Sequence, residues 1–245
     1  MKVSYKWVIH RNLMKVDSVK NSVPTTMLYS QGAFVEMLRK YGSLVLKPSG
    51  GTGGHGVILI RSLPGGRYNV QINQKIRDFP NELSLVNWVN KQPSTVKTRY
   101  LIQQCIPLAQ INGSPFTIRT VTQRRPQSNW VLTGWVAKAA GKGYFITNGR
   151  SGGTVFPVDQ AITRSNAHAN VDQVLQELRR VSLKAAQHLG NSSPRQRVVG
   201  FDMGIDRDGK VWIIEANPKP RFKAFLKLKD QSMYRRIMGF QRSPS

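Results

Sequence analysis

Apolar residues recur with a helical period in three segments of the chain, and their spacing predicts three helices. These segments are Gln31–Tyr41, Asn81–Asn90 and Asp172–Leu189. Gly42 follows the first segment and can end its helix. The positions expected to be buried are Phe34, Val35, Leu38 and Tyr41 in the first helix, Leu83, Val86 and either Trp88 or Val89 in the second, and Val174, Leu175, Leu178, Val181, Leu183 and Leu189 in the third.

Short apolar runs bounded by turn residues predict β-strands. The expected strands are residues 44–47, 57–61, 67–74, 99–105, 116–123, 130–138, 198–205 and 210–215. The Asp208-Gly209 pair is a turn signal that joins the last two strands into a hairpin. Because antiparallel neighbours dominate over an alternation of strands and helices, we expect an α+β fold and no doubly wound sheet.

The same pattern divides the chain into two α+β lobes, with a change near residues 105–113. We expect an N-terminal helix and segment over residues 1–25, a first lobe over 26–105, a second lobe over 106–225 and a basic tail over 226–245. The last 25 residues hold seven basic side chains and one acid, and they are expected to form a basic amphipathic helix with a frayed end.

Charge narrows the classes of binding partner. The 37 Lys and Arg residues against 12 Asp and Glu residues give 245 residues a formal net charge of +25, which favours an acidic substrate, a nucleic acid or an anionic surface. A single cysteine, Cys105, allows no internal disulfide. The chain shows neither an apolar run long enough to span a membrane nor the apolar core of a secretory signal, so we expect a cytoplasmic location.

A glycine-rich run, Lys47-Pro-Ser-Gly-Gly-Thr-Gly-Gly-His-Gly56, separates two expected strands. A dinucleotide-binding loop requires a helix after the glycines, but the strand Val57–Arg61 follows here. No Gly-Lys-Ser/Thr sequence closes the run, which excludes a Walker loop. The remaining interpretations are a hairpin that lies over phosphates, with Lys47 beside it, or an ordinary mobile hairpin tip.

Carboxylates are scarce, yet Asp202, Asp206, Asp208 and Glu215 fall within 14 residues. Asp202 and Glu215 lie on opposite arms of the expected hairpin, and Glu215 and Asn217 alternate on one strand face. Three oxygen ligands on one face suit Mg²⁺, which shares its sites with substrate phosphates. The alternative is a solvated hairpin edge. Asp206 and Asp208 are interpreted as turn formers, because their spacing to the next glycine and glutamate excludes an EF-hand.

Two further patterns carry weaker signals. Arg119 and Lys138 lie on neighbouring strands, where cations could stabilise a transferring phosphoryl group. The alternative, which a chain with 37 cations favours for any one of them, is a surface charge that keeps the chain soluble. The loop after Lys138 adds Asn148, Arg150, Gly152 and Gly153. The apolar strand Tyr100–Ile106 leads into a chain crossing and is either an adenine slot or an ordinary core strand.

Taken together, these segments resemble the ATP-grasp superfamily, and in particular its YheC/YheD family from endospore-forming bacteria, which is known as endospore coat-associated. The resemblance covers roughly residues 5–225. The matching segments, in order, are Lys6-Trp7, Pro24-Thr25-Thr26, Tyr41 to Pro48, the loop from Lys47 to Gly56, the hinge strand Gln103–Ile106, Trp130 to Gly134, and Asp202 followed by Trp212 to Pro220.

The resemblance implies two α+β lobes that grip ATP between them, here without most of the usual N-terminal domain. By position in the family's motifs, the implied nucleotide-binding residues are Lys6 and Lys47 at the phosphates, Gly51, Gly53, Gly54 and Gly56 in a mobile flap, and Gln103, Gln104 and Ile106 in the hinge strand, the last two framing adenine. The implied magnesium ligands are Asp202, Glu215 and Asn217, and Arg119 and Lys138 would face the γ-phosphate or the acceptor.

Relatives in this superfamily activate a carboxylate as an acylphosphate, which an amine or similar nucleophile then attacks. The chain is therefore expected to be an ATP- and Mg²⁺-dependent ligase with a carboxylate and an amine as its unidentified substrates. It departs from the family at Thr117, where relatives often have Asp, and at Lys138, where they often have Arg. The alternative is a catalytically degenerate nucleotide-binding module that binds a polyanion or a spore-coat component. No motif indicates a sequence-specific nucleic-acid binder.

Overall fold

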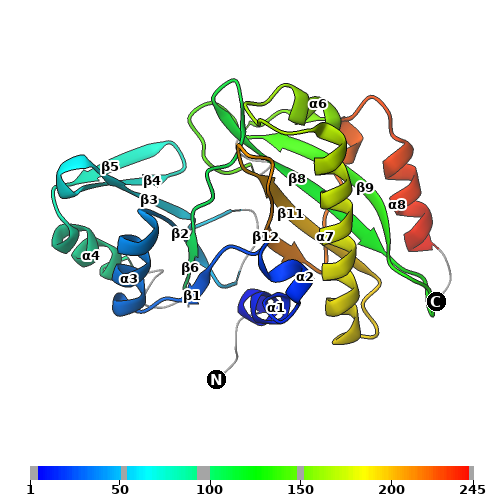
Figure 1. Ribbon diagram of the computed structural model, residues 1–245, viewed down its shortest axis with the longest axis horizontal. Helices are drawn as coiled ribbons and strands as arrows, with labels where there is room; N and C mark the ends of the chain where they lie inside the picture. Colours follow the sequence, from blue (N-terminus) through cyan, green and yellow to red (C-terminus); the bar gives the residue numbers. More distant parts are fainter. Residues whose placement is uncertain (1–4, 51–53, 93–99, 148–151, 243–245) are drawn as a thin grey trace.

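The computed structural model describes residues 5–50, 54–92, 100–147 and 152–242, and two antiparallel sheets organise them (Figure 1). The strand order of the first sheet is β1–β6–β2–β3–β4–β5. Its strands are β1 (Thr26–Leu28), β2 (Ser43–Pro48), β3 (Ile58–Leu63), β4 (Arg67–Ile72), β5 (Lys75–Phe79) and β6 (Tyr100–Gln104). The short helix η1 (Pro64–Gly66) turns the chain between β3 and β4.

The second sheet has the order β10–β9–β8–β11–β12, and β7 pairs with β8 beside this path. Its strands are β7 (Gln110–Ile111), β8 (Ser114–Gln123), β9 (Val131–Ala139), β10 (Val155–Phe156), β11 (Val198–Ile205) and β12 (Val211–Asn217). The pairings among the described strands are antiparallel, which confirms the expected α+β class.

Helices cover both sheets (Figure 1). In the first lobe α3 (Gln31–Tyr41) and α4 (Glu82–Asn90) pack against strands of the first sheet. The remaining helices are α1 (Tyr5–Leu13), α2 (Asp17–Lys20), α6 (Val158–Thr163), α7 (Val171–Asn191), η2 (Phe225–Lys227) and α8 (Ser232–Arg242). Among the helices that the structure describes, none has the length and apolar character needed to cross a bilayer.

The predicted helices and the late hairpin form where the sequence pattern placed them. Helix α3 has the predicted bounds, because Ser30 caps its first turn through the Ala33 amide and Gly42 ends it. Helix α7 extends the predicted segment by one residue at its start and two at its end. The hairpin of β11 and β12 turns at Asp208-Gly209.

Leu83 was expected in the core of the first lobe, and this prediction is wrong because its side chain is 70% exposed. Helix α4 instead buries Leu85, Val86 and Val89, a stripe with the helical period. Leu83 lies two residues before Leu85, about 200° around the helix, so it faces away from the sheet.

The predicted strand over residues 67–74 is also too long. Strand β4 ends at Ile72, and the chain reverses at Asn73, whose φ of 55° is left-handed, so that β5 pairs back onto β4. Strand β5 is at the edge of the first sheet, and four of its five residues are exposed. Such an edge strand leaves little hydrophobic pattern in the sequence.

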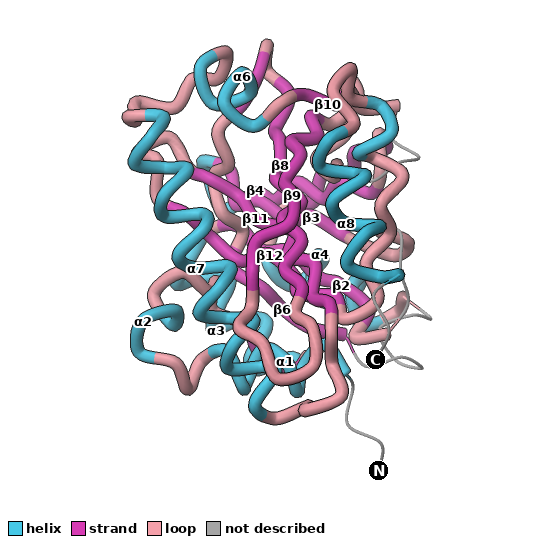
Figure 2. The backbone as a smooth tube through the Cα atoms, turned by 90° about the vertical axis from the view of Figure 1, so that its right-hand side faces the viewer, coloured by secondary structure: helices cyan, strands magenta, loops and turns pink. Residues whose placement is uncertain are grey.

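Each face of the second sheet is covered by a different helix, as Figure 2 shows for α7 and α8. Side chains alternate along a strand, so Phe116, Ile118 and Phe201 point into the core beneath α7. Val121 and Val136 point to the other face, where they pack with Phe225 and Ile237 from the C-terminal segment. This second face is the one that also carries Arg119, Lys138 and Asp202, by the same alternation and the pairing of β8 with β9 and β11.

Phe225 should therefore be a core residue although it lies 20 residues from the C-terminus. Replacing Phe225 with Ala removes a fully buried ring and should lower the free energy of unfolding by about 3–5 kcal/mol. Chemical denaturation measures this change. The neighbouring Leu226 is 45% exposed, so Leu226→Ala is the matched control and should cost less than about 1 kcal/mol. Equal losses in the two variants would show that the C-terminal segment does not pack on the sheet.

Candidate active site

A forked ion pair between β8 and β11 lies at the centre of the candidate site. Arg119 and Asp202 are directly opposite each other in the strand pairing. The Arg119 guanidinium donates from Nε to Oδ1 and from Nη2 to Oδ2 of Asp202, each at 2.8 Å. Lys138 Nζ, from β9, lies 3.5 Å from the same Oδ1. The two predicted catalytic cations thus hold the first predicted metal ligand.

Charge keeps the Asp202 carboxylate ionised despite its burial. Burial alone would raise the pKa of Asp202, but the charges and hydrogen bonds of Arg119 and Lys138 lower that pKa well below its usual value. For Arg119, burial favours the neutral form, and the Asp202 charge more than offsets this effect, so the pKa of Arg119 is raised. Both groups stay charged throughout the neutral pH range.

Glu215 is the direct cross-strand neighbour of Asp202, on β12. Its carboxylate lies 3.3 Å from the Nζ atom of Lys6, which comes from α1. The pairing of β11 with β12 is regular up to Asp202 and Glu215 and then shifts, so that Met203 pairs with Ile213. This β-bulge leaves Ile214 without a cross-strand partner.

Lys47, on β2 of the first sheet, contacts the bulge in β12 of the second sheet. Its Nζ atom donates to the Ile214 carbonyl oxygen at 3.0 Å and to Gln103 Oε1 at 3.0 Å. Gln103 is in turn fixed by its Nε2, which donates to Thr26 Oγ1 at 3.1 Å. Burial lowers the pKa of Lys47 to about 8, because the favourable charge of Glu215 only partly offsets the lost hydration and the charge of Lys6.

Six side chains therefore form one group, which we call the charged cluster: Lys6, Lys47, Arg119, Lys138, Asp202 and Glu215. Four cations surround two carboxylates, so the group carries net positive charge. Its members are accessible from solvent to different degrees: the side chains of Asp202 and Glu215 are 27% and 31% exposed, and Lys47 is nearly buried. Because both carboxylates are partly exposed, a ligand can reach them from solvent.

The predicted metal ligands share one face of the β11–β12 hairpin. Asp202 pairs with Glu215, and Asn217 follows two residues later and pairs with Gly200. The Asn217 Oδ1 accepts one hydrogen bond, from the Lys219 amide, and keeps a second lone pair. Hard oxygen donors of this kind fit Mg²⁺. The described residues contain no group of three or more His, Cys, Asp or Glu side chains able to hold a metal, so substrate phosphates or water would complete the coordination.

His10 belongs to the same site although the sequence gave it no role. It lines the hollow beside Lys47, together with Lys6 and Glu215. Burial, and then the charge of Lys47, lower the pKa of His10 to about 4, so the imidazole is neutral at pH 7. The spacing of Lys6 and His10, four residues apart on one helix face, was the signal available in the sequence.

The glycine loop is described only in part. Gly51 and Gly53 lie outside the described residues, whereas Gly54 and Gly56 have positive φ values of 74° and 71°. The Gly56 carbonyl accepts a hydrogen bond from the Tyr100 hydroxyl at 2.8 Å, and a Cβ at Gly56 would lie 2.7 Å from that hydroxyl. Glycine is therefore required where the loop returns to β3.

The remaining predicted residues do not join the charged cluster. Gln104 pairs with β2, and Ile106 is buried after the end of β6, but neither lines the hollow beside Lys47. Asn148 and Arg150 lie outside the described residues. Gly153 packs against the Ala139 carbonyl at the end of β9, where a Cβ would lie 2.1 Å from that oxygen.

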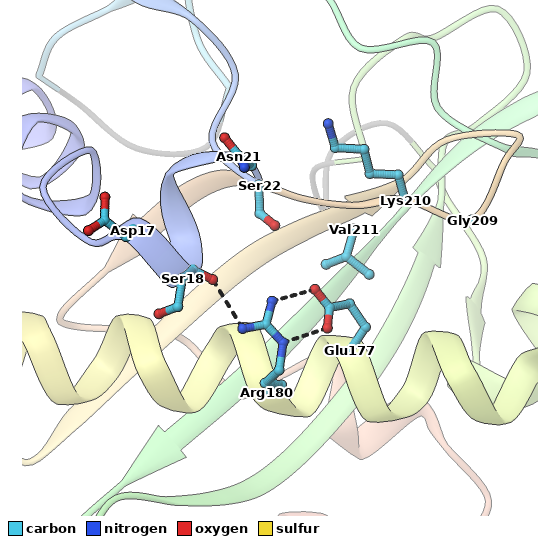
Figure 3. A pocket seen from close by; sticks show the side chains of 9 residues that line it. All are labelled: Asp17, Ser18, Asn21, Ser22, Glu177, Arg180, Gly209, Lys210 and Val211. Atoms are coloured by element: carbon cyan, nitrogen blue, oxygen red, sulfur yellow. Dashed lines mark hydrogen bonds and ion pairs between the residues drawn. The ribbon is translucent and has the colours of Figure 1, made fainter.

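Of two hollows in the structure, one is lined by residues of the charged cluster and the other is not. The one beside Lys47 measures about 30 Å³, which is too small to enclose a triphosphate. A larger one of about 400 Å³ lies between α2, α7 and the start of β12 (Figure 3). Val211 lines this larger hollow at the start of β12, and Asn217, at the other end of the same strand, lies about 20 Å away. Arg180 in this hollow already bonds to Glu177 and to the Ser18 carbonyl.

A solved structure has a fold similar to that of this chain. The C-terminal domain of Pby1 from K. lactis, described as an ATP-grasp enzyme interacting with the mRNA decapping enzyme Dcp2, matches 97% of this chain and 71% of its own length, with a TM-score of 0.58. The sequences are 14% identical, so this likeness establishes the fold.

Sequence comparison identifies the family within this fold. Two Bacillus subtilis (strain 168) proteins are similar to this chain: endospore coat-associated protein YheD, 27% identical over 88% of this chain, and endospore coat-associated protein YheC, 23% identical over 91% of it. The chain spans 48% and 61% of the lengths of these two relatives. The model of the YheC/D-like ATP-grasp family matches residues 1–240. This chain therefore belongs to the YheC/D-like ATP-grasp family.

Proposed function

We propose that this chain binds ATP with Mg²⁺ at the charged cluster and uses it to join a carboxylate to an amine. Membership of an ATP-grasp family supports ATP-dependent ligase chemistry in general. The observation that carries the proposal for this chain is the charged cluster itself, which brings two carboxylates and four cations from α1, β2, β8, β9, β11 and β12 to one place. Cations so placed bind phosphates, and the two carboxylates with Asn217 would hold the metal.

The proposed reaction has two steps. A carboxylate oxygen of the first substrate attacks the γ-phosphorus of ATP, the bond from phosphorus to the β-γ bridging oxygen breaks, and ADP leaves. The amine then attacks the acyl carbon of the acylphosphate, inorganic phosphate leaves, and the nitrogen loses a proton.

The chain contributes to both steps mainly by position and charge. Lys6 and Lys47 would bind the phosphates, and Arg119 and Lys138 would stabilise charge on the transferring phosphoryl group. When bound, magnesium would offset the negative charge of the triphosphate. The glycine loop after Lys47 would cover the nucleotide and exclude water. The likeness to YheC and YheD further supports a proposed association with the endospore coat.

The first prediction concerns the metal. ATP should raise the melting temperature of the protein strongly with Mg²⁺ and weakly without it, because ligand binding stabilises the folded state. Glu215→Gln removes one proposed metal ligand and should abolish the Mg²⁺-dependent part of the shift. Differential scanning fluorimetry measures all three values.

Glu36→Gln is the control for this experiment, since Glu36 is exposed on α3 in the other lobe. It should shift as the unmodified chain does. A full Mg²⁺-dependent shift in Glu215→Gln would refute the metal assignment.

The second prediction concerns protons. The pKa of Lys47 is held at about 8 by burial, so part of the population is neutral between pH 8 and 9. Bound phosphates should raise this pKa. At pH 8.5 Lys47 should therefore take up protons when ATP binds, whereas at pH 6.5 Lys47 is already protonated and should take up none. Titration calorimetry in buffers of different ionisation enthalpy measures the uptake.

Lys47→Arg keeps the charge but cannot lose its proton, so uptake at pH 8.5 should disappear in this variant. His10, with a pKa of about 4, would add uptake only in acid. Unchanged uptake in Lys47→Arg would mean that the phosphates do not bind at Lys47.

The third prediction concerns turnover. Mixtures of amino acids, peptides and cell-wall fragments should release ADP and inorganic phosphate in equal amounts, and mass spectrometry should find a product lighter than the two substrates by one water. Asp202→Asn should lower the rate by at least about a hundredfold, because Arg119 and Lys138 lose their anchor and the metal loses a ligand. A chain that binds MgATP but yields no ADP with any mixture would fit the degenerate module and contradict the ligase.

A further inference from the structure

A run of exposed cations follows directly after the candidate metal ligands. Between Lys219 and Arg236 the chain carries one acid, Asp230, and seven exposed basic side chains. We call these seven the basic strip: Lys219, Arg221, Lys223, Lys227, Lys229, Arg235 and Arg236. Nothing in the proposed ATP chemistry uses them.

Packing fixes the direction of these side chains. Phe222, Phe225 and Leu228 pack against the second sheet, and the basic residues between them therefore point outward. Helix α8 continues the arrangement, because Met233 and Ile237 contact the sheet while Arg235 and Arg236 are exposed. The basic strip is thus held on a folded segment.

The basic strip begins at the candidate active site. The Lys219 amide donates to Asn217 Oδ1 at 2.8 Å, and Pro220 packs on Gly200, where a Cβ would lie 2.5 Å from the Pro220 Cβ. The Pro218 carbonyl is held by Gln196 Nε2 at 2.8 Å. From this anchored start the segment runs over the same sheet face that carries Asp202, and Figure 2 shows α8 along the side opposite α7.

The charges of the basic strip have no ion-pair partners within the described residues. Asp230 accepts hydrogen bonds from the amide and the hydroxyl of Ser232 at the start of α8, and among the strip residues its charge interacts with Arg235. Helix α7, on the other face of the sheet, differs: it carries three Lys or Arg and two Asp or Glu residues, and Arg180 pairs with Glu177. Like charges that repel one another favour an external polyanion.

We propose that the basic strip docks an acidic polypeptide and leads one of its carboxylates to the charged cluster as the acceptor. This assignment rests on the proposed function, because a ligase of this kind consumes a carboxylate. An extended acidic chain matches a row of cations that starts at Asn217 and continues away from it. Single-stranded nucleic acid fits less well, because it binds through exposed aromatic rings, and Phe222, Phe225 and Tyr234 pack against the sheet.

The test compares two triple variants that change the net charge equally. Lys223→Glu, Lys227→Glu and Lys229→Glu reverse the middle of the basic strip. Lys75→Glu, Arg179→Glu and Lys184→Glu reverse three exposed cations on β5 and α7. Fluorescence anisotropy with a labelled oligoglutamate peptide should show about tenfold or greater weakening in the first triple and less than about twofold in the second, with binding that falls as salt rises.

Further measurements separate this proposal from the proposed function. The Mg²⁺-dependent thermal shift with ATP should be unchanged in the strip triple, whereas ADP release with oligoglutamate as the carboxylate should fall. Equal weakening in the two triples, or no binding of oligoglutamate by the unmodified chain, would overturn the docking surface. Tighter binding of an RNA oligomer or of anionic vesicles through the same three lysines would overturn the acidic polypeptide as its partner. Loss of the thermal shift in the unmodified chain would count against the ATP site alone.

Discussion

The Asp202 carboxylate must stay ionised on a partly buried sheet face, and this requirement organises the site. Asp202 meets it through the forked pair with Arg119 and the nearby Lys138. Its cross-strand neighbour Glu215 forms an ion pair with Lys6. Removing one partner of such a pair leaves the other charge without compensation, which costs more than the pair contributes. The site therefore depends on the register of β8, β9, β11 and β12, because a slip of one residue in any of these strands would turn its charged side chains to the opposite face.

The β-bulge at Ile214 makes a second link, between the lobes. A regular strand would use the Ile214 carbonyl in the ladder with β11, whereas the bulge frees it to accept from Lys47. Because Lys47 ends a strand of the first sheet, one hydrogen bond connects the base of the glycine loop to the carboxylate hairpin. The ammonium group has three donors, and Gln103 and Ile214 take two of them, so under the proposed function the third could bind a phosphate while the link between the lobes is kept.

Sequence reasoning succeeded where a local rule decides the structure. The Asp208-Gly209 turn fixed the hairpin, and the alternation of Glu215 and Asn217 fixed their common face. It failed where a distant contact decides. Leu83 has the composition of a core residue, but the packing of α4 turns it outward. The bulge and the pairing of Arg119 with Asp202 depend on strand register, for which single-sequence patterns carry no signal. For His10 the sequence offered only its spacing from Lys6, and the docking of α1 decides that it enters the site.

The period of two along a β-strand also explains why the site and the C-terminal segment meet. Val121 and Val136 lie two residues from Arg119 and Lys138, so the apolar pair and the charged pair must occupy the same face. The apolar half of that face requires a cover, and Phe225 and Ile237 supply it. This cover begins two residues after Asn217, where Pro220 packs on Gly200, so it starts beside the strands that carry Asp202 and Glu215. The exposed basic residues on the outer side of that cover are the ones to which we assign the docking of an acidic substrate.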